Sequence, residues 1–265
     1  MSQSRMPLLF IGHGSPMNAI EDNPFTKTLV RLGSELPKPK AILCISAHWL
    51  TARTWVSHTP HPKLIHDFLP SPPLPQQVFE VQYQASGDPN LAEHISASIQ
   101  NTRVLLDDHW GLDHGAWSVF KHMYPKANIP IIELSIDMSI TAECHFELGA
   151  QLKPLRDQGV LIVGSGNIVH NIKEIIWDNQ KAKPYSWAVE FDEQVKQCIV
   201  QRDFIPLIGD LLYTSAGRLS VPTTDHYYPL LYTLGASDNN DSLRFEYEEI
   251  QSGSISMRTL SLGLA

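Results

Sequence analysis

Several histidines in this chain stand in short motifs rich in glycine, serine, asparagine or proline, where imidazoles can serve chemistry. A neutral imidazole is the commonest side-chain ligand of Zn, Fe, Ni and Cu. Three protein ligands with an open position are typical of a catalytic metal site. The motifs are Gly12-His13-Gly14-Ser15-Pro16, Ser46-Ala47-His48-Trp49, Ser165-Gly166-Asn167-Ile168-Val169-His170-Asn171 and Asp225-His226-Tyr227-Tyr228-Pro229.

Each of these histidines also has a plainer interpretation as a hydrogen-bonded structural residue at the end of a strand. No HExxH helix and no Asp-rich cluster accompanies them, which weakens the interpretation as a zinc peptidase. Cys44, Cys144 and Cys198 are widely spaced and indicate neither a disulfide framework nor a thiolate zinc site. A mononuclear metal site, including one that activates water for hydrolysis, stays open at this point.

A fifth histidine, His114, lies in Leu112-Asp113-His114-Gly115-Ala116-Trp117, just before a short helix predicted over residues 116–124. At a helix N-terminus the dipole disfavours a second positive charge and keeps an imidazole neutral, which suits a proton acceptor. The alternative is that the segment only begins the helix, with Asp113 as its N-cap. The local sequence favours neither.

The elements that must position these side chains alternate between strands and helices. Short apolar runs at 7–11, 40–46, 130–136 and 159–164 predict buried strands. Helical periodicity follows the first run up to Pro37 and recurs at 141–155, 185–199 and, more briefly, 204–212. This order predicts an α/β fold with a central mixed, largely parallel sheet flanked by helices, in a single catalytic domain over residues 1–265.

The remaining segments are less regular. Residues 243–249 and 254–262 predict an antiparallel hairpin that closes one edge of the sheet. Residues 59–75 carry six prolines and predict a structured wall or lid rather than a helix. Residues 215–229 show no periodicity, and they contain His226.

In open α/β sheets, sites gather beyond the C-terminal ends of the strands. His13 follows the strand at 7–11 and His48 follows the strand at 40–46. We expect these two strands to be neighbours in a βαβ unit, which would bring the two imidazoles together. His170 lies just past the strand at 159–164, so it should reach the same edge.

Charge and hydropathy exclude some classes of function. With 28 acidic and 20 basic residues the formal net charge is −8, and no run of lysine or arginine gathers, so nucleic acid is not an expected partner. No apolar stretch approaches the roughly 18 residues that a membrane span needs. We therefore expect a cytoplasmic globular protein.

Together the five histidine motifs, in this order, resemble those of the class III extradiol ring-cleavage dioxygenases, and most closely the DOPA 4,5-dioxygenase branch. The resemblance runs from about Pro7 to the C-terminus. It implies an enzyme that opens a catechol ring next to its diol with O2 as co-substrate. It also implies one mononuclear non-haem metal per chain, Fe(II) for turnover, although members are found carrying Zn(II).

The same resemblance implies roles for individual residues. His13 and His48 match the two metal histidines, and His226 matches a third ligand position that other class III enzymes fill with a carboxylate. His170 matches the catalytic base and is also a candidate fourth ligand. His114 matches a second catalytic histidine. The implied partner is a small aromatic catechol such as DOPA, bound by a monomer or a homodimer.

Overall fold

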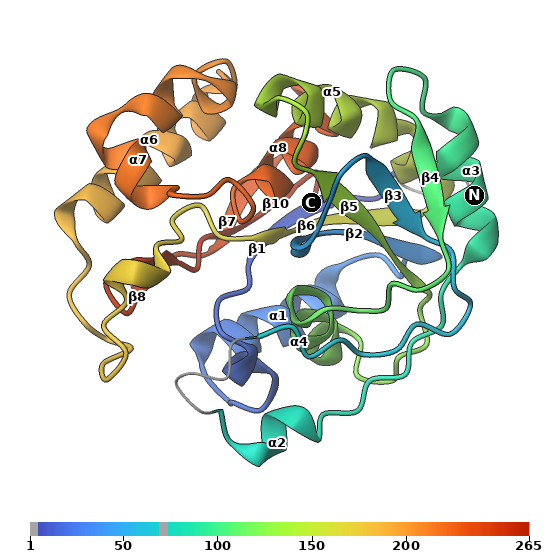
Figure 1. The fold of residues 1–265 in the computed structure, drawn as a ribbon, viewed down its shortest axis with the longest axis horizontal. Coiled ribbons are helices and arrows are strands. Elements are labelled where there is room, and N and C mark those ends of the chain that lie inside the picture. Colours follow the sequence, from blue (N-terminus) through green and yellow to red (C-terminus); the bar gives the residue numbers. More distant parts are fainter. Residues whose placement is uncertain (1–4, 69–73, 265) are drawn as a thin grey trace.

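The chain folds around one eight-stranded mixed sheet (Figure 1). The computed structural model describes residues 5–68 and 74–264. In spatial order the strands are β4 (Val104–Asp107), β3 (Thr54–Ser57), β5 (Ile131–Asp137), β2 (Ala41–Thr51), β6 (Val160–Gly166), β1 (Leu8–Gly12), β10 (Thr259–Leu262) and β7 (Leu243–Tyr247). Parallel pairs join β1 to β6, β6 to β2, β2 to β5 and β3 to β4, whereas the remaining pairs of this sheet are antiparallel.

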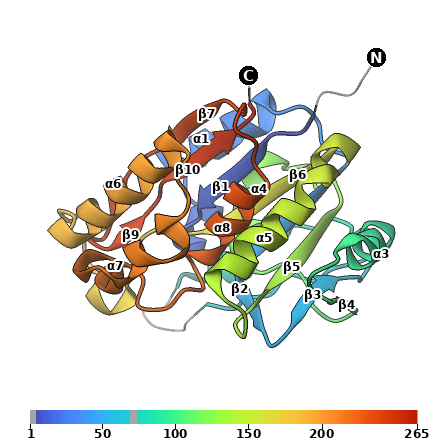
Figure 2. The same ribbon diagram turned by 90° about the horizontal axis from the view of Figure 1, so that it is seen from above.

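Helices cover both faces of this sheet, as the sequence predicts for strands that are apolar throughout. The α-helices of the described residues are α1 (Pro24–Glu35), α2 (Gln76–Phe79), α3 (Pro89–Ser98), α4 (His114–Met123), α5 (Ala142–Leu152), α6 (Ser186–Gln201), α7 (Ser215–Ser220) and α8 (Tyr228–Gly235). Figure 1 shows α1 and α4 on one face and α5 and α8 on the other, and Figure 2 shows α6 beside β10 and β7.

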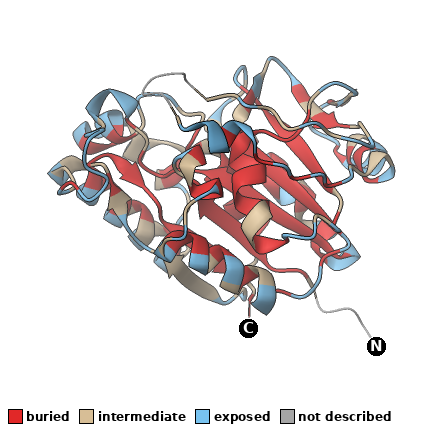
Figure 3. Ribbon diagram, turned by 90° about the horizontal axis from the view of Figure 1, so that it is seen from below, coloured by how far each residue is buried: buried red, intermediate tan, exposed pale blue. Residues whose placement is uncertain are grey.

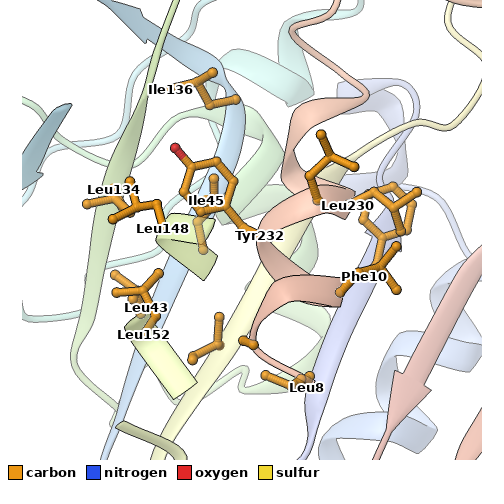
Figure 4. Close-up of a cluster of buried hydrophobic side chains, with 14 of the residues drawn as sticks. Leu8, Phe10, Leu43, Ile45, Leu134, Ile136, Leu148, Leu152, Leu230 and Tyr232 are labelled. Carbon is orange, nitrogen blue, oxygen red and sulfur yellow. The ribbon is translucent and has the colours of Figure 1, made fainter. Parts of the chain in front are cut away.

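Alternate residues of the central strands point into two separate hydrophobic cores, one on each face of the sheet. Leu8 and Phe10 of β1 pack with α5 and α8, whereas Leu9 and Ile11 pack with α1 and α4. Figure 4 shows the first of these cores, in which Tyr232 of α8 lies against side chains of the sheet. Figure 3 shows the central strands buried between the helices. The period of two in side-chain direction explains the division.

One prediction about strand order is wrong. β1 and β2 are not neighbours, because β6 lies between them and pairs in parallel with both. The βαβ rule describes how consecutive strands are connected and does not exclude a strand between them. Here β6, which comes later in the chain, lies between β1 and β2. Because all three strands run in parallel, their C-terminal ends still meet at one edge, so the expected meeting place of the histidines is preserved.

The C-terminal region confirms the predicted sheet edge and adds a second turn. β7 and β10 pair antiparallel, and β7 is the edge strand. Between them, β8 (Ile250–Gln251) and β9 (Ile255–Ser256) form a small hairpin. Its turn holds Ser252 and Gly253 at φ of 51° and 82°. Positive φ at two successive central residues is the conformation that a tight hairpin turn requires.

Several local predictions need correction. Residues 204–212 do not form a helix of the α type, because Pro206 interrupts the pattern and two 3-10 turns, Pro206–Ile208 and Asp210–Tyr213, take its place. The unpatterned residues 215–229 contain α7 and the start of α8. Among the described helices, none is both long enough and apolar enough to cross a membrane.

The described part of the proline-rich segment forms a wall, as predicted. The amide of Ile65 donates to the carbonyl of Leu112 at 2.7 Å, and Leu112 donates back to Lys63 at 2.8 Å. The indole of Trp117 donates to the Ile65 carbonyl at 3.0 Å. These bonds fasten the segment to the start of α4. Pro70, Pro72 and Pro73 of this segment lie outside the described residues.

A buried arginine ties together three distant parts of the chain. The guanidinium of Arg156, 1% exposed, forms a bidentate pair with Asp241 at 2.7 and 2.8 Å. Its remaining bonds go to the carbonyl oxygens of Met6, at 2.8 Å, and Ala236, at 3.2 Å. A planar guanidinium with five donors suits this arrangement, and no other side chain supplies it.

We expect Arg156→Ala to lower the free energy of unfolding by about 3–5 kcal/mol, because it removes one partner of a buried ion pair. Urea denaturation followed by circular dichroism measures the change. Lys27→Ala is the control, since Lys27 and Asp22 are 69% and 80% exposed and should contribute no more than about 1 kcal/mol. A loss of less than about 1 kcal/mol in Arg156→Ala would contradict this assignment.

Candidate active site

A cavity of about 700 Å³ opens at the C-terminal edge of the sheet. His48, His114, His170 and His226 line it. His13 lies beneath them with 1% of its surface exposed, and its ring is in contact with three of the four. The sequence motifs therefore converge on one place, although they come from five separate segments of the chain.

His13 is positioned by the end of β1. Its backbone amide donates to the Gly166 carbonyl at the end of β6, at 3.2 Å. Its Nδ1 lies 3.0 Å from the hydroxyl of Ser165, which itself donates to the Gly115 carbonyl at 2.7 Å. Because that hydroxyl has only one proton to give, it accepts from Nδ1 of His13. The Nε2 lone pair of His13 is therefore free.

His48 reaches the site through an irregularity in β2. Between Ile45 and Leu50 the pairing advances by five residues on β2 but by only two on β5. The extra residues leave the ladder and re-aim His48, as bulges beside active sites commonly do. Its Nδ1 lies 3.0 Å from the Asp67 carboxylate, and its Nε2 lies 3.0 Å from Nε2 of His13.

His226 comes from the loop that precedes α8. Its carbonyl accepts from the Asn167 amide at 2.9 Å. This loop can approach β6 only because residue 166 is glycine, since a Cβ there would lie 2.2 Å from the His226 carbonyl oxygen. Nδ1 of His226 lies 2.8 Å from the Asp225 carboxylate, so this histidine too presents a free Nε2.

The three imidazoles of His13, His48 and His226 form a nearly equilateral triangle. Their ring centroids are 5.0, 5.0 and 5.3 Å apart. Two Nε2 lone pairs at 3.0 Å repel each other unless a proton or a metal ion lies between them. Ligand nitrogens at about 2.0–2.1 Å from one ion are themselves about 3 Å apart, so the spacing of the His13 and His48 nitrogens fits two ligands of a single metal ion.

His114 stands beside this triangle. It is the first residue of α4, whose N-cap Asp113 accepts from the Ala116 amide, so the capping interpretation is confirmed. The imidazole also faces the site, with its ring centroid 3.9 Å from that of His48. Nδ1 and the backbone amide of His114 each lie 3.0 Å from Oδ1 of Asp67. The ligand nitrogens of His13, His48 and His114 lie within 4.8 Å of one another, and a second such group is formed by His170, Asp225 and His226.

His170 has a different relation to its neighbours. Its ring stacks flat on that of His226, with centroids 3.4 Å apart and 8° between the planes. An ion in the plane of one imidazole cannot also lie in the plane of a parallel ring stacked on it. The backbone amide of His170 donates to the Ser220 carbonyl at 2.9 Å, which fixes this position.

Burial keeps most of the cluster uncharged. It lowers the pKa of His13 and of His170 well below the ordinary value, and neighbouring imidazoles add to the effect. Burial likewise lowers the pKa of His226 to about 4. His48 differs, because burial opposes its charge but the contact with Asp67 raises its pKa overall. Neutral imidazoles are the form that binds a metal.

The two carboxylates of the cluster stay ionised. Burial alone would raise the pKa of Asp67, but its contacts with His114 and His48 lower it overall. The hydrogen bond from His226 likewise outweighs burial at Asp225 and lowers its pKa. The lowered pKa values favour the ionised form of both carboxylates, and each carboxylate contacts the outer nitrogen of an imidazole.

Sequence reasoning missed two of these supporting residues. Asp67 contacts both His48 and His114, yet nothing in the sequence of the proline-rich segment marks it as a partner of either histidine. Ser165 stands in the His170 motif, where nothing marks it as a partner of His13. A carboxylate or hydroxyl acceptor for each candidate imidazole is the signal that could have prompted a search for them.

The chain is similar to known proteins over most of its length. Residues 7–256 match the family described as the catalytic LigB subunit of aromatic ring-opening dioxygenase. The 4,5-DOPA dioxygenase extradiol of Escherichia coli K12 is 44% identical over 99% of this chain and 97% of its own length. The protein of that name from Mirabilis jalapa is 34% identical over 87% of this chain and 86% of its own.

A solved structure is similar throughout. The crystal structure of an uncharacterized protein from Escherichia coli K12 matches with a TM-score of 0.84 and 41% identity, covering 98% of this chain and 100% of that one. The match includes the mixed sheet and its flanking helices. From the motif order, the histidine cluster and these likenesses, the chain belongs to the LigB family of extradiol, aromatic ring-opening dioxygenases.

Proposed function

We propose that this enzyme opens the ring of DOPA, or of a closely related catechol, next to its diol with O2 as co-substrate. Several relatives named 4,5-DOPA dioxygenase extradiol support the choice of substrate. The observation that carries the proposal is the triangle of three imidazoles, each with its outer nitrogen occupied and its inner nitrogen free.

We assign His13, His48 and His226 as the metal ligands. Fe(II) bound by this triad would supply the chemistry of holding the diol and O2 side by side. An all-nitrogen triad also suits Zn(II), so we expect zinc to bind without supporting ring opening. Ser165, Asp67 and Asp225 hold the outer nitrogens and so fix the direction of each ligand.

We assign His170 as the base that accepts a proton from the catechol. It lines the cavity, it is neutral, and its stacking on His226 disfavours the alternative of a fourth ligand. His114 lines the opposite flank, beside His48, where it can hold or return a proton during ring opening. Asp67 orients this ring by accepting from its Nδ1.

Metal content tests the ligand assignment. We expect His13→Ala and His226→Ala to lose the bound metal, because two imidazoles do not hold a mononuclear ion as three do. Elemental analysis of protein purified at a fixed metal concentration measures this loss. His94→Ala, on the outer surface of α3, is the control. Full metal retention in His13→Ala would remove His13 from the ligand set.

Turnover tests the base assignment. We expect His170→Gln to lower kcat by about 10²–10⁴-fold while metal content stays near that of the unaltered protein. Steady-state oxygen consumption with Fe(II)-loaded protein gives kcat, and elemental analysis gives the occupancy. If metal content falls together with kcat, His170 is a ligand after all, and unchanged kcat would exclude both roles.

Oxygen uptake tests the reaction itself. We expect apo-protein reconstituted anaerobically with Fe(II) to consume O2 when DOPA and air are admitted. A new visible absorption from the semialdehyde product should rise in step with the uptake. The Zn(II)-loaded protein is the matched control and should do neither. An absence of uptake with DOPA and with simpler catechols would contradict the proposed reaction.

A further inference from the structure

The cavity is larger than a bare catechol ring requires. Its volume of about 700 Å³ falls in the range of pockets that hold drug-sized ligands. Beyond the histidines its walls are largely apolar, with Phe68, Leu74, Ile175 and Ile255 among them. A substrate whose ring lies at the histidines therefore has room for a substituent that extends along the cavity. The charged residues on the wall determine which charge on that substituent is favoured.

One basic residue, Lys173, lines this cavity within the described part of the chain. It lies in the 3-10 turn Ile172–Glu174, three residues after His170. Its amide donates to the Asn171 side chain at 3.1 Å, and Asn171 in turn donates to the Leu219 carbonyl at 2.8 Å. The backbone is therefore held, while the side chain is exposed and its ammonium has no ion-pair partner among residues 5–68 and 74–264.

The acidic residues on the same wall are already engaged. Asp67 and Asp225 contact the outer nitrogens of the histidines. The Glu21 carboxylate accepts from the Asn23 side chain at 3.1 Å. Because like charges brought together raise the free energy of binding, these three carboxylates disfavour an anionic substituent placed beside them, whereas the ammonium of Lys173 on the same wall favours one.

We propose that Lys173 binds a carboxylate carried by the side chain of the catechol, so that the preferred substrates are carboxylated catechols. This inference rests on the proposed ring-opening function and identifies the group that selects within that substrate class. A lysine ammonium on a flexible four-carbon stem can follow a carboxylate over several positions. Because no hydrogen bond or ion pair within the described part of the chain joins the Lys173 side chain to the histidine cluster, we expect it to contribute to affinity and not to the chemical step.

Three catechols test the effects of a carboxylate and of an ammonium on the substrate separately. DOPA carries a carboxylate and an ammonium, 3,4-dihydroxyphenylpropanoate carries only the carboxylate, and dopamine carries only the ammonium. In Lys173→Met we expect KM to rise about tenfold for the two carboxylated compounds, with little change for dopamine and no change in kcat. Lys173→Glu should lower KM for dopamine. Lys181→Met, an exposed lysine that does not line the cavity, is the control.

Binding measured without turnover keeps the two proposals apart. Calorimetric titration under anaerobic conditions, with the Fe(II) protein, should show a tenfold loss of affinity for 3,4-dihydroxyphenylpropanoate in Lys173→Met and little for dopamine. An equal loss for all three compounds, or none, would overturn the role of Lys173. If binding follows the expected pattern but no compound is opened, the ring-opening function fails and the carboxylate site stands.

Discussion

The proposed metal site depends on one constraint, which is that three imidazoles turn the same nitrogen toward a common point. A histidine ring has two nitrogens, and the acceptor on the outer one decides which lone pair remains free. Here a serine hydroxyl serves His13, and carboxylates serve His48 and His226. The fold brings these acceptors to the same edge of the sheet from β6, from the proline-rich wall and from the loop before α8. Much of the local structure follows from that requirement.

Asp67 shows how the requirement links separate elements. One carboxylate contacts His48 of β2 and His114 of α4, so the wall that carries it cannot move without disturbing both. The wall is in turn fastened to the start of α4 by backbone bonds between Ile65 and Leu112. Prolines limit its alternative conformations and reduce the entropy lost on ordering it. A carboxylate on a rigid support orients its partners more sharply than one on a loop without such bonds.

The sequence predicts the meeting of the histidines better than it predicts the path of the chain between them. His13 and His48 follow apolar runs, and the C-terminal ends of parallel strands share an edge whatever their order. That is why His13 and His48 meet as predicted, although the prediction that β1 and β2 are neighbours is wrong. Strand order depends on which late strand pairs with an early one, and no local pattern records that β6 fits between them. The sequence does not predict the position of Asp67 for the same reason, because backbone hydrogen bonds to a distant segment hold its part of the chain in place.

The charge of the donor set also bears on what the site can bind. If His13, His48 and His226 hold a divalent ion as proposed, three neutral imidazoles would leave its full formal charge in place, whereas a carboxylate ligand would cancel part of it. A catechol that lost a proton to the proposed base His170 would bring negative charge to the same point, so a nitrogen triad would favour the anionic form of the substrate. Asp67 and Asp225 lie one imidazole further out, where they orient the ligands and repel the anion less than a carboxylate bound to the ion would. With the proposed ligand set, a histidine at position 226 in place of a carboxylate would therefore strengthen the hold on the diol, and the far end of the cavity would decide which catechol enters.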